Sequence, residues 1–149
     1  TGPEPRVVVI QDLDQPLATE SYWGEVNGNI NRALGCVGVV TNGGVRDLDE
    51  VHALGFHFFA AQVLVSHGYA HVVDFGTPVN VGGIIISAGD LLHADKHGVV
   101  VIPHEVARRV TTAAATIEAT ERRIINYCKS PEFSAGGLKV LWQETRSAK

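Results

Sequence analysis

The sequence has few cysteines and no long apolar run. Its two cysteines, Cys36 and Cys128, lie far apart, so we expect no disulfide framework and a reducing, cytoplasmic compartment. No apolar run approaches the roughly 20 residues that a membrane-spanning helix requires. The first residues also lack the basic and apolar regions of a signal peptide. These absences exclude a secreted disulfide scaffold and predict no membrane partner.

An excess of positive charge is also lacking. The formal net charge is -4 and the pI is near 5.9, whereas nucleic-acid-binding domains are usually basic. Nucleic acid is therefore not an expected partner. Hydrophobic residues make up 45% of the chain and charged residues 19%, which indicates a globular protein. A chain of 149 residues is long enough to bury a substantial core in one domain.

Short β-branched runs alternate with helix-forming segments in the first third of the chain. Strands are predicted at residues 7–10 and 37–41, and helices at 21–34 and 47–54, with Gly55 ending the second helix. This order is typical of an α/β unit.

The remainder is richer in strands until a final helical segment. Turn residues separate predicted strands at 56–60, 70–75, 79–81, 83–87 and 99–102. Such a block is incompatible with a simple doubly wound parallel sheet. Apolar residues recur at helical spacing over 104–129 and predict a long helix.

We expect a single α/β domain over residues 1–130 and a tail over residues 131–149. The tail contains Gly136-Gly137, a predicted hinge, and then the apolar run Leu138–Trp142. An apolar run beyond a hinge suits the surface of a neighbouring subunit, although it can also fold back on its own domain.

The segment NGGVRDLDEVHALG, residues 42–55, allows two interpretations. In the first, Asp47 caps the following helix and Glu50 completes a capping box. This leaves Arg46 unexplained, because its charge lies beside the positive end of a helix. In the second, Arg46 and a helix N-terminus bind a carboxylate, while nearby carboxylates hold a divalent cation. The Gly24-Glu25 pair favours the second interpretation, which describes a site that stabilises the enolate of a small 2-oxo acid.

An ordered series of motifs carries a resemblance to a known family. Glu25 is separated from Arg46-Asp47 by twenty residues, and Glu50 follows three positions later. Further matching stretches are WGE at 23–25, GVVTNGGVRD at 38–47, PVNVGG at 78–83, AGDLLHAD at 88–95 and GVVVIP at 98–103. On these motifs the sequence resembles the RraA-like family, which includes class II pyruvate aldolases.

The resemblance implies a β/β/α sandwich of the swivelling phosphohistidine-domain type with a long C-terminal helix. It also implies a homotrimer or a dimer of trimers with sites between subunits. The part that family members carry before the first strand is expected to be missing. The implied activity is divalent-metal-dependent cleavage of 4-hydroxy-2-oxo acids, such as 4-hydroxy-4-methyl-2-oxoglutarate, to release pyruvate, with oxaloacetate decarboxylation as a side activity. The alternative is a non-catalytic protein that regulates a ribonuclease.

The same resemblance assigns roles to individual residues. Asp47 would bind Mg²⁺ or Mn²⁺, Glu50 would support the metal through water, and Glu25 would orient a metal-bound water. Arg46 would hold the pyruvyl group and stabilise its enolate. The substrate carboxylate would be bound by the backbone N–H groups of Gly24, Glu25, Val26 and Asn27. Position 25 is Asp in the aldolases that the chain resembles, so the longer Glu side chain alters the position of the water.

Other polar residues receive weaker assignments. His67 and His71 are four residues apart, as zinc ligands on a helix can be, but Gly68 lies between them and the segment is predicted to be a loop. Glu118 or Glu121 is a candidate acid for a neighbouring subunit's site, although a solvent-facing helix charge is the simpler interpretation.

Overall fold

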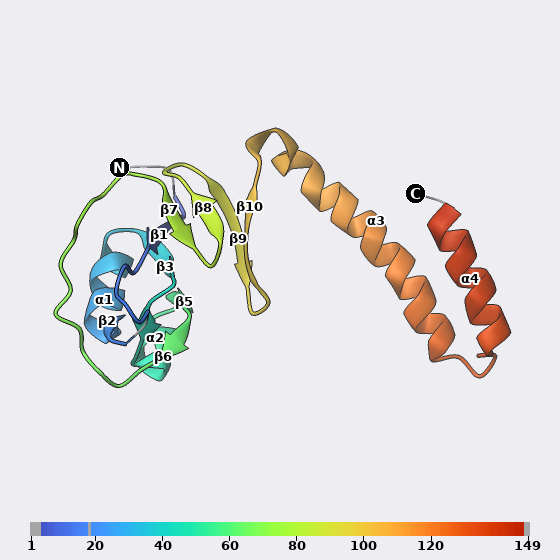
Figure 1. Ribbon diagram of the computed structural model, residues 1–149. Helices are drawn as coiled ribbons and strands as arrows, with labels where there is room; N and C mark the ends of the chain where they lie inside the picture. The colour runs from blue at the N-terminus through green and yellow to red at the C-terminus, as the bar shows by residue number, and fades with distance from the viewer. Residues whose placement is uncertain (1–3, 18, 148–149) are drawn as a thin grey trace. The chain divides into compact units, whose positions relative to one another are not determined.

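The structure is a computed structural model that describes residues 4–17 and 19–147. The chain divides into two compact units, with the boundary in the sequence between Ile102 and Pro103 (Figure 1). The predicted long helix lies in the second unit, and the division into a domain over residues 1–130 and a tail stays a prediction. Each unit is described by itself.

Two small parallel sheets form the α/β part of the first unit. One has the order β1-β3-β5 and the other β2-β4-β6. Two helices, α1 and α2, follow β2 and β4 along the chain. The bounds are β1 Arg6–Ile10, β2 Ser21–Trp23, α1 Glu25–Ala33, β3 Cys36–Thr41, β4 Gly44–Val45, α2 Leu48–Ala53, β5 His57–Phe59 and β6 Gln62–Val63.

Two antiparallel hairpins complete the first unit. They pair β7 (Val79–Val81) with β8 (Ile84–Ile86), and β9 (Leu91–Asp95) with β10 (Gly98–Ile102). The predicted strands at 79–81, 83–87 and 99–102 are therefore confirmed, and β9 is an additional strand. The mixed α/β architecture agrees with the sequence analysis.

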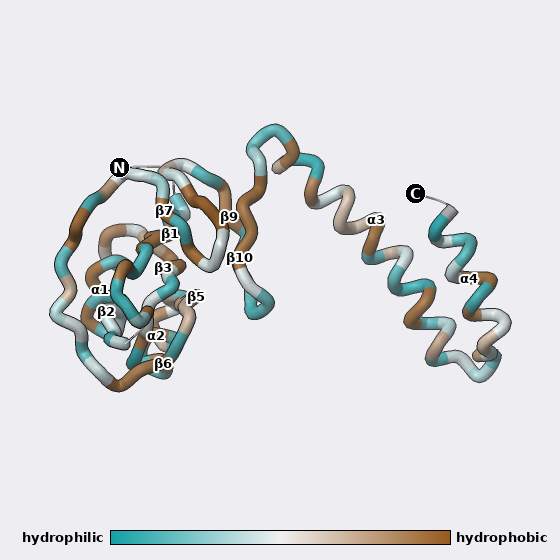
Figure 2. Tube along the Cα trace, viewed as in Figure 1, coloured by the Kyte–Doolittle hydropathy of each residue, from teal (hydrophilic) through white to brown (hydrophobic). Residues whose placement is uncertain are grey.

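The core of the first unit lies on both faces of β3. Successive side chains of a strand point to opposite faces, so Val39 and Val40 enter different clusters. Val39 packs with a group completed by Trp23, Val45, Val51 and Phe56. Val40 packs with Val81 and Ile86 of the first hairpin. Figure 2 shows apolar residues on the strands of this unit, and also on α1 and on the loop between β6 and β7. Burying each of these valines contributes about 1.5–3 kcal/mol relative to exposure.

Two of the predicted elements in this unit are wrong. Residues 21–34 are not one helix: Ser21–Trp23 form β2, because Ser21 pairs with Gly44 and Trp23 is buried in the core. Residues 70–75 form no strand but belong to a long loop between β6 and β7 (Figure 1). Within this loop Val72 and Val73 are exposed, and no described strand pairs with them.

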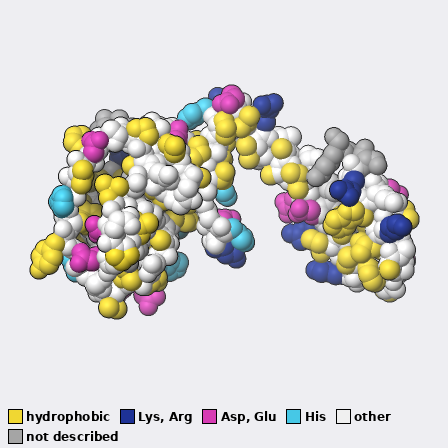
Figure 3. All heavy atoms as spheres, in the orientation of Figure 1, with side chains coloured by type: hydrophobic (Ala, Val, Ile, Leu, Met, Phe, Trp, Pro, Cys, Tyr) yellow, Lys and Arg dark blue, Asp and Glu magenta, His cyan; other side chains and the backbone are white. Residues whose placement is uncertain are grey.

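The second unit is a helical hairpin of α3 (His104–Cys128) and α4 (Ala135–Ser147). Arg123 of α3 and Glu144 of α4 form an ion pair of 3.6 Å. Apolar and polar residues alternate along α3 (Figure 2), and charged side chains lie among apolar ones on the visible face of the hairpin (Figure 3). Among the described residues, no helix is long and apolar enough to cross a membrane.

The Gly136-Gly137 hinge is also a wrong prediction, because both residues lie in the first turn of α4. The side chain of Ser134 accepts a hydrogen bond from Gly137 N at 3.1 Å, and Ser134 O accepts one from Leu138 N at 2.9 Å. Ser134 therefore caps the helix and holds the glycines in it. A Cβ at Gly137 would collide with the hydroxyl of Tyr127, so the second glycine allows the two helices to approach.

Candidate functional site

The parallel pairing of β2 with β4 brings the two sequence motifs together. Ser21 lies opposite Gly44, and Trp23 opposite Val45. The residues that follow these strands therefore meet at the same sheet edge, Gly24 from one strand and Arg46-Asp47 from the other. A hydrogen bond from Arg46 N to Trp23 O, at 2.9 Å, continues the pairing to this point.

Asp47 stands at the start of α2 but does not cap it. Its backbone is left-handed, with φ 56° and ψ 47°, and its side chain makes no hydrogen bond to the helix. Among the described residues, no other non-glycine residue has a positive φ. The carboxylate instead accepts a hydrogen bond from the backbone N of Glu25, the first residue of α1, at 2.8 Å. The predicted capping box is therefore wrong: Asp47 is placed at the N-terminus of the neighbouring helix.

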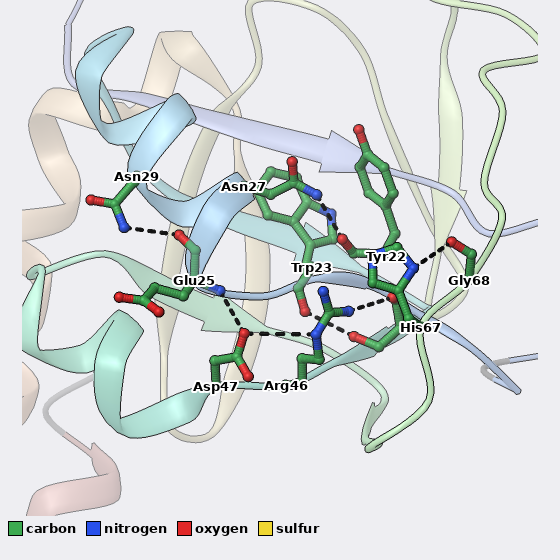
Figure 4. Close-up of polar contacts among 10 residues, drawn as sticks. Tyr22, Trp23, Glu25, Asn27, Asn29, Arg46, Asp47, His67 and Gly68 are labelled. Atoms are coloured by element: carbon green, nitrogen blue, oxygen red, sulfur yellow. Dashed lines mark hydrogen bonds and ion pairs between the residues drawn. The ribbon is translucent and has the colours of Figure 1, made fainter.

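The Arg46 side chain is held by β2 and by Asp47. Its Nη1 donates to Ser21 O at 2.8 Å, and its Nε lies 3.7 Å from Asp47 Oδ2 (Figure 4). The Arg46 side chain is 22% exposed and that of Asp47 is 38% exposed. Within the described part of the chain, Arg46 Nη2 has no acceptor. The guanidinium thus keeps donors for an anion that approaches from solvent.

Gly24 allows the close approach of these groups. A Cβ at this position would lie 2.5 Å from Asp47 Oδ2 and 3.0 Å from Arg46 Nε. Any side chain here would displace the ion pair, and for this reason the position requires glycine.

The N-terminus of α1 keeps two donors free of acceptors. The N–H of Glu25 donates to the Asp47 carboxylate. The first hydrogen bond of the helix runs from Gly28 N to Gly24 O at 2.9 Å. The N–H groups of Val26 and Asn27 have no acceptor among the described residues. The Asn27 side chain turns back to donate to Tyr22 O at 2.6 Å. Donors at a helix N-terminus beside a guanidinium suit a carboxylate.

The two predicted accessory acids are less closely associated with this pair. The Glu25 carboxylate is exposed and points away from Arg46 in Figure 4. Glu50 is exposed in the first turn of α2, and its carboxylate forms no hydrogen bond or ion pair within the described chain. The structure therefore unites Arg46, Asp47 and the backbone of residues 24–27, whereas the roles of Glu25 and Glu50 stay predictions.

The donor set is compatible with a hydrated divalent cation. Among the described residues, no group of three or more His, Cys, Asp or Glu side chains converges as a metal cage. However, Mg²⁺ is commonly held by one or two carboxylates and completed by water and substrate. Asp47 Oδ1 has no partner in the described chain, because both contacts of the side chain are made by Oδ2. This oxygen is available for such a cation.

Ser21 also belongs to the site, a role that its sequence context did not predict. Its carbonyl accepts from both Arg46 Nη1 and Gly68 N, the latter at 3.2 Å. Its N–H donates to Ser66 O at 3.1 Å, and it forms a β-bridge with His67. Ser21 therefore joins the loop after β6 to the Arg46-Asp47 pair. His67, in the SHG sequence at 66–68, was predicted only as a weak candidate for a zinc ligand.

The chain is similar to several known proteins. The chain is 30% identical over 111 residues to a protein of Halalkalibacterium halodurans named "Putative 4-hydroxy-4-methyl-2-oxoglutarate aldolase", covering 71% of this chain and 53% of that protein. The chain spans 20% to 58% of the length of the first three curated relatives.

Solved structures share the fold. An uncharacterized protein from Pseudomonas syringae pv. tomato matches with a TM-score of 0.71 and 27% identity, over 93% of this chain and 63% of that one. An unusual member of the RNase ES inhibitor RraA protein family from Streptomyces coelicolor matches with a TM-score of 0.63 and 25% identity, over 78% of this chain and 59% of that one. The family described as RraA-like, Aldolase/RraA, matches residues 1–101. The chain therefore belongs to the RraA-like family.

Proposed function

We propose that this chain carries the active site of a divalent-metal-dependent aldolase, which cleaves 4-hydroxy-2-oxo acids of the 4-hydroxy-4-methyl-2-oxoglutarate type to release pyruvate. Oxaloacetate decarboxylation is the proposed side activity, since it forms the same pyruvate enolate. The main support is that Arg46 and Asp47 lie together at the N-terminus of α1. The relative named as an aldolase supports the same reaction class.

The cation, Mg²⁺ or Mn²⁺, would be held by Asp47 Oδ1 and water, with Glu50 contributing through water. When bound, it supplies Lewis-acid polarisation of the 2-oxo group. Glu25, at the start of α1, is the proposed residue that orients a bound water.

The chain's own groups account for substrate binding and charge stabilisation. The substrate carboxylate accepts hydrogen bonds from the N–H groups of Val26 and Asn27. Arg46 Nη2 faces the pyruvyl oxygens and stabilises the negative charge that develops as the carbon–carbon bond breaks. The carbonyl of Ser21 fixes Nη1 of the same guanidinium, so little reorganisation is needed during the reaction.

The test is pyruvate release from 4-hydroxy-4-methyl-2-oxoglutarate and from oxaloacetate, with Mg²⁺, with Mn²⁺ and with chelator. Asp47→Asn keeps the size of the side chain and removes its charge, and we expect turnover to fall about 100-fold or more. Asp49→Asn is the matched control, because Asp49 is an exposed acid of α2 and its loss should leave turnover unchanged. Metal-independent turnover, or equal turnover by Asp47→Asn, would contradict the proposal.

For the assembly we propose a homotrimer or a dimer of trimers. Support comes from the loop between β6 and β7, where Val65, Tyr69 and Phe75 are 99%, 98% and 88% exposed. Apolar side chains that are so exposed are commonly covered by a partner. Sedimentation analysis that returned only a monomer would contradict this assembly.

The same loop favours a second candidate function, a protein that regulates a ribonuclease by direct contact. A related structure is described as belonging to a family of RNase ES inhibitors. The test is inhibition of a ribonuclease of this class by the wild-type chain and by Tyr69→Ser/Phe75→Ser. Inhibition that is lost in this loop variant and retained in Asp47→Asn would favour the regulator.

A further inference from the structure

A pocket separate from the candidate active site lies at the carboxyl ends of the sheet β1-β3-β5. Gln11 and Asp12 follow β1, and Asn42 follows β3. Asn80 of β7, a strand that lies beside β1, lines the pocket as well (Figure 1). The volume is about 560 Å³, within the roughly 300–1,000 Å³ of small-molecule sites. Ligands of open α/β sheets commonly bind outside the carboxyl ends of the strands, so this pocket has the place and the size of a binding site.

Three carboxamide side chains in this pocket have fixed orientations. Gln11 Oε1 accepts a hydrogen bond from Asn80 N at 2.8 Å, and Asn80 Oδ1 accepts one from Gly83 N at 3.1 Å. Asn42 Oδ1 accepts from Asp12 N at 2.6 Å. Because a backbone N–H can only donate, the oxygen of each carboxamide must face it, and the NH₂ group is directed elsewhere. Within the described chain, the NH₂ groups of Gln11 and Asn80 donate to no protein acceptor. The pocket therefore offers oriented donors to a ligand.

Asp12 supplies an acceptor in the same pocket. Its Oδ1 accepts from Asp14 N at 2.9 Å, and its Oδ2 lies so close to Gly43 that a Cβ there would be 3.0 Å away. A carboxylate has lone pairs for about four hydrogen bonds, so it can accept further ones from a ligand. Among the described residues that line the pocket, Asp12 is the only charged one and none is a histidine. The pocket thus combines neutral donors with one negative acceptor.

This combination distinguishes between classes of ligand. An anion would meet the charge of Asp12 without a cationic side chain in the lining to offset it. An ammonium group suits Asp12 but cannot accept from the NH₂ groups of Gln11 and Asn80. A hydroxyl group both donates and accepts, so adjacent hydroxyls satisfy both kinds of partner. Leu13 and Leu17, which are 58% and 44% exposed, line the same pocket and can cover the apolar C–H face of a sugar ring.

We propose that this pocket binds a neutral ligand with adjacent hydroxyl groups on a sugar ring. One hydroxyl donates to the Asp12 carboxylate, and its neighbour accepts from the NH₂ group of Gln11 or Asn80. A free monosaccharide and the ribose of a nucleoside carry this same chemistry. The lining includes neither Arg46 nor Asp47, so the inference goes beyond the proposed aldolase function and does not rest on it.

The first experiment follows the side-chain NH₂ signals of the full chain by nitrogen-15 NMR during titration with D-glucose, D-ribose and adenosine. The matched control ligand is 2′-deoxyadenosine, which lacks one of the two adjacent hydroxyls, and succinate is the anionic control. We expect saturable shifts of the Gln11 and Asn80 signals, with a dissociation constant of about 1 mM or below, and no shift of these signals with succinate. The signals of Asn27 and Asn29 in α1 should stay in place.

The outcomes separate the two sources of the ligand. Shifts with a monosaccharide support a sugar site, and shifts with adenosine that are lost with 2′-deoxyadenosine support a nucleoside site. The proposal is overturned if the Gln11 and Asn80 signals respond to none of these ligands at about tenfold the expected constant, or if they respond to succinate. Equal shifts with adenosine and 2′-deoxyadenosine, without a response to either monosaccharide, also overturn it.

The second experiment measures the affinity of variants for whichever ligand binds. Asp12→Asn keeps the shape of the side chain and removes its charge. Gln11→Glu keeps the oxygen that accepts from Asn80 N and replaces the NH₂ donor. Each should weaken binding about 10-fold or more. Asp14→Asn is the matched control, because Asp14 is an exposed acid that does not line the pocket, and its affinity should stay within about twofold. Far-ultraviolet circular dichroism identifies the variants that fold, and unchanged affinity in a folded Asp12→Asn or Gln11→Glu overturns the proposal.

Discussion

The carboxylate of Asp47 joins two helices: it stands at the start of α2 and accepts a hydrogen bond from Glu25 N, the first residue of α1, at 2.8 Å. The same oxygen lies 3.7 Å from Arg46 Nε. A negative charge at the N-terminus of α1 is favourable for the helix dipole. The position of Asp47 is therefore stabilising for the fold and places a charged pair at the surface.

The left-handed backbone of Asp47 gives a first prediction, on stability. Asp47→Ala loses the hydrogen bond to Glu25 N, at a cost of about 1 kcal/mol, and keeps a Cβ in the left-handed region without the polar side chain that makes this conformation tolerable for Asp. Asp47→Gly loses the same hydrogen bond, but glycine adopts φ 56° readily. We expect Asp47→Gly to be more stable than Asp47→Ala by about 1 kcal/mol. Urea unfolding of both variants measures the difference, and the opposite order would contradict it.

The second prediction concerns Gly24. In Gly24→Ala the new methyl group would lie 2.5 Å from Asp47 Oδ2, so the carboxylate and Arg46 must move apart. We expect pyruvate release to fall at least about 10-fold, since small displacements of positioning groups are costly to catalysis.

The control for this change is Gly28→Ala in the same helix. Its Cβ would lie 3.3 Å from Val51 Cγ2, away from the charged pair, so activity should remain near that of the wild type. Activity retained in Gly24→Ala, measured in parallel with the far-ultraviolet circular dichroism of both variants, would show that the ion pair tolerates the methyl group.

Much of the fold was predictable from local patterns. The Val-rich runs at 7–10 and 37–41 became β1 and β3, and the apolar spacing over 104–129 became α3. Gly55 ends α2 with φ 66°, as its place after the helix predicted. These elements follow from side chains within one segment, so sequence periodicity is enough to identify them. The swivelling-domain sandwich stays a prediction.

What was not predictable depends on contacts between distant segments. Ser21–Trp23 looked helical and became a strand because its partner is β4, about twenty residues away. Asp47 looked like a cap of its own helix because spacing alone cannot reveal a left-handed backbone. The pairing of Ser21 with His67 likewise spans 46 positions and leaves no periodic signal. The motif around Arg46-Asp47 was identified by resemblance, and its geometry only by the fold.

The third prediction uses the two glycines of α4 as a matched pair. A Cβ at Gly136 would meet no atom within 4 Å, whereas one at Gly137 would collide with the Tyr127 hydroxyl. Because alanine is the better helix former, Gly136→Ala should be neutral or stabilise by up to about 1 kcal/mol. Gly137→Ala should destabilise, because Tyr127 must give up its contacts with Ser134. Thermal unfolding of the two variants decides this, and equal effects would mean that the helices do not approach at Gly137.

The last prediction concerns the pH dependence of the β9–β10 hairpin. The backbone N–H of His97, 2.8 Å from Asp95 Oδ1, is the main cause that lowers the pKa of Asp95 from its ordinary value of 3.8. The His97 ring, with Nδ1 3.1 Å from Asp95 Oδ2, lowers the pKa further, and the more distant charge of His93 acts in the same direction.

A folded pKa below the unfolded one means that the carboxylate stabilises the hairpin above about pH 3.8, and that this contribution is lost as the pH falls through the folded pKa. NMR titration of the Asp95 carboxyl carbon should therefore give a midpoint below 3.8. In Asp95→Asn the amide oxygen still accepts from His97 N–H, so the amide signal of His97 should lose its acid titration while the hairpin stays formed. A midpoint at or above 3.8 in the wild-type chain would mean that the turn does not hold the carboxylate as described.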